Sequence, residues 1–171
     1  EDDSTTGFIR PYEDGYSFMA LLPKEGISIE DYISHLSAEK LIGLVENAST
    51  DYDVDAAIPK FKSEYSIELK DALQNMGMTD AFDEEQADFR GIGTSDNGNI
   101  YINMVLHKTY IEVDEQGTKA GASTVVGMAE TMSLYEPEIK TVHLDRPFVY
   151  AIIDTETQMP IFLGVTESVE E

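Results

Sequence analysis

Apolar and polar residues alternate along much of this chain, a pattern that predicts strands more often than helices. The alternating segments are rich in β-branched and aromatic residues, and turn-forming pairs such as Asp14-Gly15 and Gln116-Gly117 punctuate them. β structure therefore dominates the prediction. The expected strands cover residues 7–9, 16–22, 54–61, 99–113, 148–153 and 160–165.

Three short helices are predicted between these strands. Two fit between Ile27 and Glu46, with Ser28 and Ser37 as N-caps. A third helix has apolar residues at i, i+3, i+4 and i+7, a capping serine before it and a glycine just past its end. Its residues are Ser66, Leu69, Ala72, Leu73, Met76 and Gly77. The predicted fold class is α+β, with mixed β-sheets and short helices.

Residues 117–136 are mostly small or polar and show no helical period, so they predict a long exposed loop, and loops of this length usually have a function. In extended form, alternate residues from Thr118 to Met128 would share one face and Lys119 would lie on the other. Small side chains near its start suit a segment that enters an existing sheet as a new strand. A flexible linker of Gly, Ala and Ser is the alternative interpretation.

Composition restricts the possible partners. The chain has 171 residues, 42% of them hydrophobic, which suffices for one globular core. A net charge of −23 would repel nucleic acids and anionic membranes. The chain has no cysteine for a disulfide or a thiolate site, and its apolar runs are too short to predict a membrane span or a signal peptide.

Motifs of enzymes and metal sites are missing. There is no phosphate-binding loop, no HExxH and no nucleophile elbow, and Gly91-Ile92-Gly93 lacks the third glycine of a dinucleotide site. His35, His107 and His143 have no metal-ligand partner at short spacing. The sequence therefore predicts no catalytic residue, no metal site and no cofactor. A hydrolase built on two of the many carboxylates is the weakest alternative.

Two further motifs have an ordinary explanation. Asp51, Asp53 and Asp55 alternate like the start of a calcium loop, but Ala56 replaces the required glycine and Lys62 the bidentate glutamate. A solvated strand face is predicted instead. The acceptor sequon at residues 47–49 is interpreted as incidental.

The segment from Glu115 to Thr124 resembles the hinge of the serpins, the serine protease inhibitors. Its sequence, Glu-Gln-Gly-Thr-Lys-Ala-Gly-Ala-Ser-Thr, is similar to the family's Glu-Glu-Gly-Thr-Glu-Ala-Ala-Ala-x-Thr. Other blocks resemble serpin segments in serpin order, at residues 8–12, 16–23, 58–62, 73–82, 106–113, 145–148 and 161–164. Two departures are Lys119 in place of the usual glutamate and a loop several residues longer than is typical.

The resemblance implies that residues 1–171 are the C-terminal part of a single serpin domain, with the N-terminal serpin portion missing. It also implies an exposed reactive loop at about residues 117–141. The implied scissile bond joins Thr131 and Met132, or Met132 and Ser133 if the longer loop shifts the register. The implied hinge residues are Glu115, Gly117, Thr118, Ala120, Gly121, Ala122, Ser123 and Thr124.

The implied function is suicide inhibition of serine proteases, or alternatively of cysteine proteases, by loop cleavage and insertion, without enzymatic activity. Elastase-like targets are favoured and trypsin-like ones disfavoured, because no Lys or Arg occurs from Gly121 to Ile139. The family implies an extracellular or cell-surface location. Alternatives are a non-inhibitory serpin, serving in storage, chaperoning or carriage, and an acidic cation-binding or interaction module.

Overall fold

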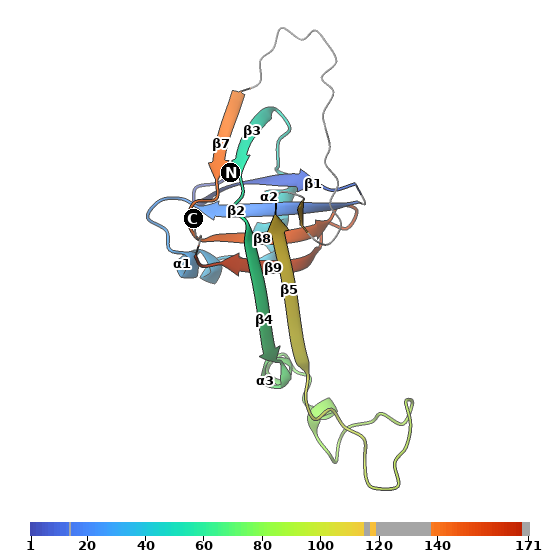
Figure 1. Cartoon of the computed structure of the whole chain (residues 1–171). Helices are drawn as coiled ribbons and strands as arrows, with labels where there is room; N and C mark the ends of the chain where they lie inside the picture. Colours follow the sequence, from blue (N-terminus) through green and yellow to red (C-terminus); the bar gives the residue numbers. More distant parts are fainter. Residues whose placement is uncertain (14, 115–116, 119–137, 169–171) are drawn as a thin grey trace. The chain divides into compact units, whose positions relative to one another are not determined.

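The computed structural model describes residues 1–13, 15–114, 117–118 and 138–168. The chain divides into two compact units, Glu1–Lys62 with Glu112–Glu171, and Ser63–Ile111. Strands make up most of the regular structure, with short helices between them (Figure 1). The predicted α+β class with mixed sheets is confirmed.

The first unit is built on an antiparallel sheet of four strands in the order β1-β2-β8-β9. These strands are β1 (Thr5–Pro11), β2 (Tyr16–Pro23), β8 (Phe148–Asp154) and β9 (Pro160–Thr166). The central strands β2 and β8 are buried along nearly their whole length, as expected for strands covered on both faces. All four strands were predicted, and only their ends differ from the prediction.

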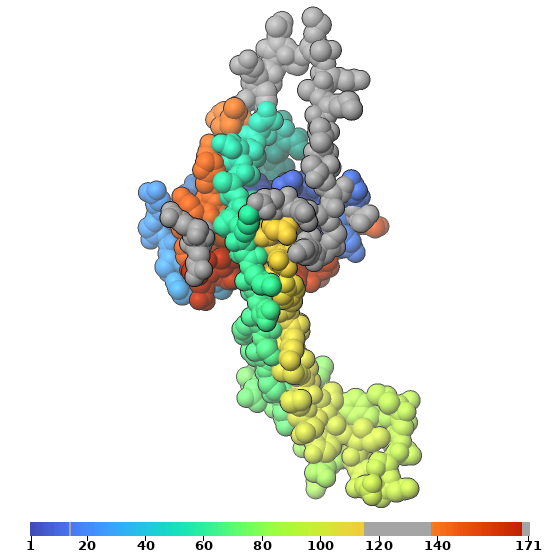
Figure 2. All heavy atoms as spheres, in the orientation of Figure 1, coloured from blue at the N-terminus to red at the C-terminus, as the bar shows by residue number. Residues whose placement is uncertain are grey.

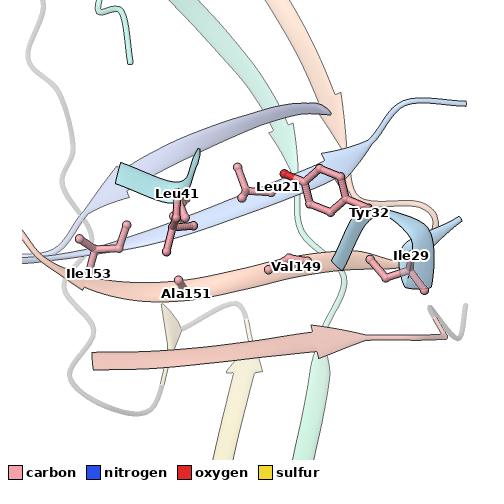
Figure 3. Close-up of a cluster of buried hydrophobic side chains, with 8 residues drawn as sticks. Leu21, Ile29, Tyr32, Leu41, Val149, Ala151 and Ile153 are labelled. Atoms are coloured by element: carbon pink, nitrogen blue, oxygen red, sulfur yellow. The ribbon is translucent and has the colours of Figure 1, made fainter. Parts of the chain in front are cut away.

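Two helices cover one face of this sheet, α1 (Ile29–Ser34) and α2 (Ala38–Glu46). The Ser28 hydroxyl accepts the Asp31 N–H at 3.1 Å, and the Ser37 hydroxyl accepts the Lys40 N–H at 3.2 Å, so both predicted N-caps are confirmed. The side chains between the helices and the sheet form a closely packed core (Figure 3). Its buried members are Met19, Leu21, Ile29, Tyr32, Leu41, Val149, Ala151 and Ile153.

Aromatic side chains cover the other face of the four-stranded sheet. The Tyr150 ring stacks on Phe18 and on Phe162, with centroid distances of 6.4 and 6.1 Å. Tyr150 is also paired with Gly164 across strands β8 and β9, and a Cβ at Gly164 would overlap its ring. Glycine at this position therefore gives the aromatic layer the room it needs.

A second sheet in the first unit pairs β3 (Tyr52–Ala57) with β7 (Glu138–His143) in parallel. Every residue of β3 is exposed, so the prediction of a solvated strand face around Asp53 and Asp55 is confirmed. The predicted strand 54–61 is wrong at residues 58–60, where β3 has ended at Ala57 and β4 has yet to begin at Phe61. Pro59, which has no N–H to donate to a ladder, stands where that strand breaks.

The next strand, β4 (Phe61–Glu68), leads into the second unit, followed by α3 (Lys70–Asn75), a 3₁₀ turn η1 (Asp80–Phe82) and β5 (Leu106–Asp114). Most β4 side chains are exposed, and the green atoms of this strand are open to view in Figure 2. No residue of α3 is fully buried; Leu69 and Leu73 on its apolar side are half-buried, and Met76 just past its end is exposed.

Two predictions for the second unit are wrong in part. Ser66 lies within β4 and caps no helix; α3 begins after Leu69 without a side-chain cap. The predicted strand 99–113 is a strand only from Leu106, because the residues before it bond to turns: the Asn99 amide donates to the Glu84 and Ala87 carbonyls. The predicted left-handed glycine after the helix is confirmed, with φ of +101° at Gly77.

Candidate functional site

Two residues of the predicted hinge, Gly117 and Thr118, lie beside the end of β5. Gly117–Thr118 form a short strand, β6, that pairs antiparallel with β5: Thr118 lies opposite Val113, and Gly117 opposite Asp114. The sheet order is β4-β5-β6, so β6 occupies the edge of β5 that β4 leaves free. A chain that continued in this direction would run along β5 as an added strand.

Most of the predicted hinge and the whole predicted reactive bond lie outside the described residues. These are Glu115, Ala120, Gly121, Ala122, Ser123, Thr124, Thr131, Met132 and Ser133. The structure places two predicted hinge residues, Gly117 and Thr118, in β6. Glu138–Thr141, which the prediction included in the loop, belong to strand β7, so the segment between the two strands is residues 119–137.

Strand β7 was not predicted, and it is the C-terminal anchor of this segment. The signal was present, because Ile139, Thr141 and Val142 are β-branched residues that favour strands. Its pairing with β3 runs from Tyr52 opposite Glu138 to Ala57 opposite His143. The partner strand β3 precedes β7 by more than eighty residues in the sequence. Local sequence patterns do not identify a partner at that distance.

Lys140 is the best-connected side chain of the β3–β7 pair. Its Nζ donates to the Glu1 carboxylate at 3.0 Å and lies 4.1 Å from the centroid of the Tyr52 ring. The hydrogen bond with Glu1 raises the pKa of Lys140, and bonds to Lys140 and to Lys24 lower the pKa of Glu1. The ion pair between Glu1 and Lys140 thus connects the first residue of the described chain with β7.

His143 lies near Asp55 on the neighbouring strand, with its Nε2 3.5 Å from the carboxylate. Asp55 is distant from His143 in the sequence, whereas His35 contacts Asp31 one turn earlier in its helix. Among the described residues, no group of three or more His, Asp or Glu side chains is arranged to hold a metal ion.

A groove of about 740 Å³ lies beside β1 in the first unit. It is bordered by β1 and β2, the end of α2 and one side of the β3–β7 pair, including Tyr52 and Lys140. Its lining is mostly apolar.

In the part of the chain that the structure describes, no helix is long and apolar enough to cross a membrane.

The chain matches the family described as Serpin (serine protease inhibitor) over residues 2–168. It is 38% identical over 152 residues to Serpin B10 of Rhinolophus ferrumequinum, covering 86% of this chain and 36% of the relative. It is 37% identical to an uncharacterized serpin-like protein of Thermococcus kodakarensis, covering 96% of this chain and 37% of that protein.

Solved structures agree with these relatives. The native state of the thermophilic serpin Tengpin superimposes with a TM-score of 0.80 at 49% identity, covering 98% of this chain and 43% of Tengpin. Thyroxine-binding globulin in complex with thyroxine gives a TM-score of 0.71 at 27% identity, covering 98% and 42%. The chain therefore spans about two-fifths of the length of these proteins. On this sequence and structural agreement, the chain belongs to the serpin family of serine protease inhibitors.

Proposed function

We propose that the chain is the C-terminal part of an inhibitory serpin that traps serine proteases through residues 119–137. The observation that carries the proposal is the start of this segment: Gly117 and Thr118 already pair antiparallel with the free edge of β5. The small residues that follow, from Ala120 to Ser123, can enter a sheet without steric conflict. Insertion would thus continue a strand that has begun.

In this mechanism the loop is a substrate. The serine of the protease attacks the reactive bond and forms an acyl-enzyme, with the new amino terminus at residue 132 or 133 as the leaving amine; β8 and β9 after it belong to the four-stranded sheet. The loop then adds to β5 as a strand, which is a form of β-augmentation. About ten new sheet hydrogen bonds, at about 1 kcal/mol each, would favour insertion over the exposed state. The uncut protein must then be kinetically trapped.

The proposed reactive bond is Thr131–Met132, with Met132–Ser133 as the alternative register. Neither side offers a basic residue, so a specificity pocket with an aspartate at its base would bury that charge unpaired. Elastase-like pockets, which are shallow and apolar, suit threonine and methionine. The proposed partners are therefore an elastase-like protease, in an extracellular or cell-surface setting, and the N-terminal serpin portion that supplies the second neighbour of the inserted strand.

A substitution at the hinge tests the insertion mechanism. Thr118→Arg in the full-length protein would place a guanidinium at the first step of insertion, where burial without a partner costs several kcal/mol. We expect the variant to be cut normally while the protease escapes active, instead of forming a denaturant-resistant complex. Lys119→Glu is the matched control, because residue 119 is expected on the solvent side; it should retain complex formation. Equal trapping by Thr118→Arg and the wild type would contradict the proposal.

A non-inhibitory carrier is the second candidate, favoured by the likeness to thyroxine-binding globulin, whose structure contains thyroxine. The two functions are distinguishable with one protease panel. A carrier would form no covalent complex with elastase-, chymotrypsin- or trypsin-like enzymes, whereas the inhibitor would form one with the elastase-like enzyme.

A further inference from the structure

The connection between η1 and β5 carries the Asn-Gly pair of this chain, Asn97 and Gly98. The other asparagines of the sequence, at positions 47, 75, 99 and 103, all precede a residue with a side chain. Asparagine is one of the thermolabile residues of proteins. Its side-chain amide is lost when the backbone nitrogen of the next residue attacks it, and glycine, which has no Cβ, obstructs that attack least.

Asn97 lies at a polar loop tip within the second unit. Every residue from Thr94 to Asn99 is exposed, and none of them has an apolar side chain. The backbone N–H of Asn97 donates to the Ser95 hydroxyl at 3.1 Å. Since this tip has no apolar surface that requires burial against the rest of a longer protein, we expect it to stay accessible to solvent there as well.

The backbone at Gly98 leaves room for the reaction. Its φ is +130°, a conformation that residues with a side chain rarely adopt. Apart from its chain neighbours, no heavy atom of the described residues lies within 4 Å of the place where a Cβ would stand. The space beside the Gly98 nitrogen, which the attacked amide must approach, is therefore open.

Asn99, two residues later, is held by its side chain. Its Nδ2 donates to the Glu84 carbonyl at 3.0 Å and to the Ala87 carbonyl at 2.8 Å. These bonds must break before its amide carbon can reach the next nitrogen, which belongs to the β-branched Ile100. In the part of the chain that the structure describes, the Asn97 side chain has no such hydrogen bond.

We propose that Asn97 is a site of spontaneous deamidation, and that the two hydrogen bonds of Asn99 restrict the reaction at this loop tip to Asn97. The Gly98 nitrogen bonds to the Asn97 Cγ, the Cγ–Nδ2 bond breaks, and ammonia leaves with the proton of the Gly98 N–H. Water from the solvent then opens the succinimide ring at either carbonyl and gives aspartate or isoaspartate. The modification adds a negative charge beside Asp96 and does not depend on the proposed inhibition of proteases.

Peptide mapping by mass spectrometry tests the proposal on the full-length protein, incubated in mildly alkaline buffer. Trypsin releases residues 91–108 as one peptide, and its tandem spectra locate a mass gain of about 1 Da, the difference between an amide and an acid. Asn97 should convert about tenfold or more faster than Asn99, because the hydrogen bonds of Asn99 oppose its ring closure. The isoaspartyl product should appear as a separate chromatographic peak.

Ile100→Gly is the matched variant, because it gives Asn99 a glycine neighbour and leaves both of its hydrogen-bond acceptors in place. Asn99 should still convert more slowly than Asn97 in this variant. Asn97→Gln should remove the mass gain, since a glutamine side chain does not form the five-membered ring. An Asn97 that stays intact in the wild type, or equal rates at Asn97 and Asn99 in either protein, would overturn the inference.

Discussion

The four-stranded sheet of the first unit and the residues of the second unit differ sharply in how well they bury their apolar side chains. Strands β2 and β8 are buried almost throughout, between α1 and α2 on one face and an aromatic layer on the other. In the second unit, Met76 is 84% exposed and Tyr65 is 56% exposed. Monomeric proteins rarely leave several large apolar side chains uncovered in one region.

This difference teaches which part of the chain is self-sufficient. The central strands β2 and β8 are covered on both faces within this chain, whereas the edge strand β9 leaves Ile161 and Leu163 more than half exposed. The second unit buries only a few apolar residues, Phe82, Ala87 and Ile111, and leaves others such as Met76 largely exposed among the described residues; the chain spans about two-fifths of the relatives it matches. We expect the longer protein to cover these exposed side chains.

The largest expected effect comes from a pair of tyrosines, one in each region. Tyr150→Ala removes a ring that is 99% buried and should lower the free energy of unfolding by about 3–5 kcal/mol. Tyr65→Ala on β4 should change it by no more than about 0.5 kcal/mol in the isolated chain. Urea unfolding followed by circular dichroism measures both. A similar loss of unfolding free energy in both variants would contradict the difference between the two regions.

Two glycine-to-alanine substitutions should change the free energy of unfolding by smaller amounts and in opposite directions. Gly77 has φ of +101°, so Gly77→Ala should cost about 1–2 kcal/mol. Gly43 lies inside α2 with open space at its Cβ position, so Gly43→Ala should stabilise by about 0.5–1 kcal/mol. Thermal unfolding of the two variants beside the wild type checks the signs. Stabilisation by Gly77→Ala would show that the turn after α3 does not hold its glycine in this conformation.

The smallest expected effect is a pH-dependent change in the stability of the first unit, through Asp2. Burial alone would raise the pKa of Asp2, but hydrogen bonds from Ser4 and Thr5, and Lys40 nearby, lower it below its usual value. A lowered folded-state pKa adds stability above the unfolded pKa of about 3.9, and this is lost as pH falls through the folded pKa. Asp2→Asn should thus destabilise the chain at neutral pH and converge with wild type in strong acid. A difference that is independent of pH would contradict this.

The sequence predicts the self-sufficient region better than the other. Strands β2 and β8 and the caps Ser28 and Ser37 follow from local patterns, because burial and capping leave clear periodic signals. The prediction fails at residues 99–105 and at Ser66, where contacts distant in sequence decide the conformation: Asn99 bonds back to a turn, and Ser66 joins a strand.

In the candidate site too, some features follow from local sequence patterns and others depend on contacts between distant residues. The hinge stays a prediction: residues 115–124 were assigned by their resemblance to the serpin pattern, and the structure describes only Gly117 and Thr118 of them, which pair with β5. Strand β7 and the contact between Lys140 and Tyr52 depend on a parallel pairing between residues more than eighty positions apart. No pattern within either segment specifies that partner.

The most direct test of the central claim is the mass of the C-terminal peptide that separates on denaturation, after the full-length protein has trapped an elastase-like protease. The account predicts a denaturant-resistant complex and a C-terminal peptide that begins at Met132 or Ser133. Rapid trapping of a trypsin-like protease instead, with a peptide that begins after Lys119 or Lys140, would contradict both the proposed reactive bond and the proposed target class.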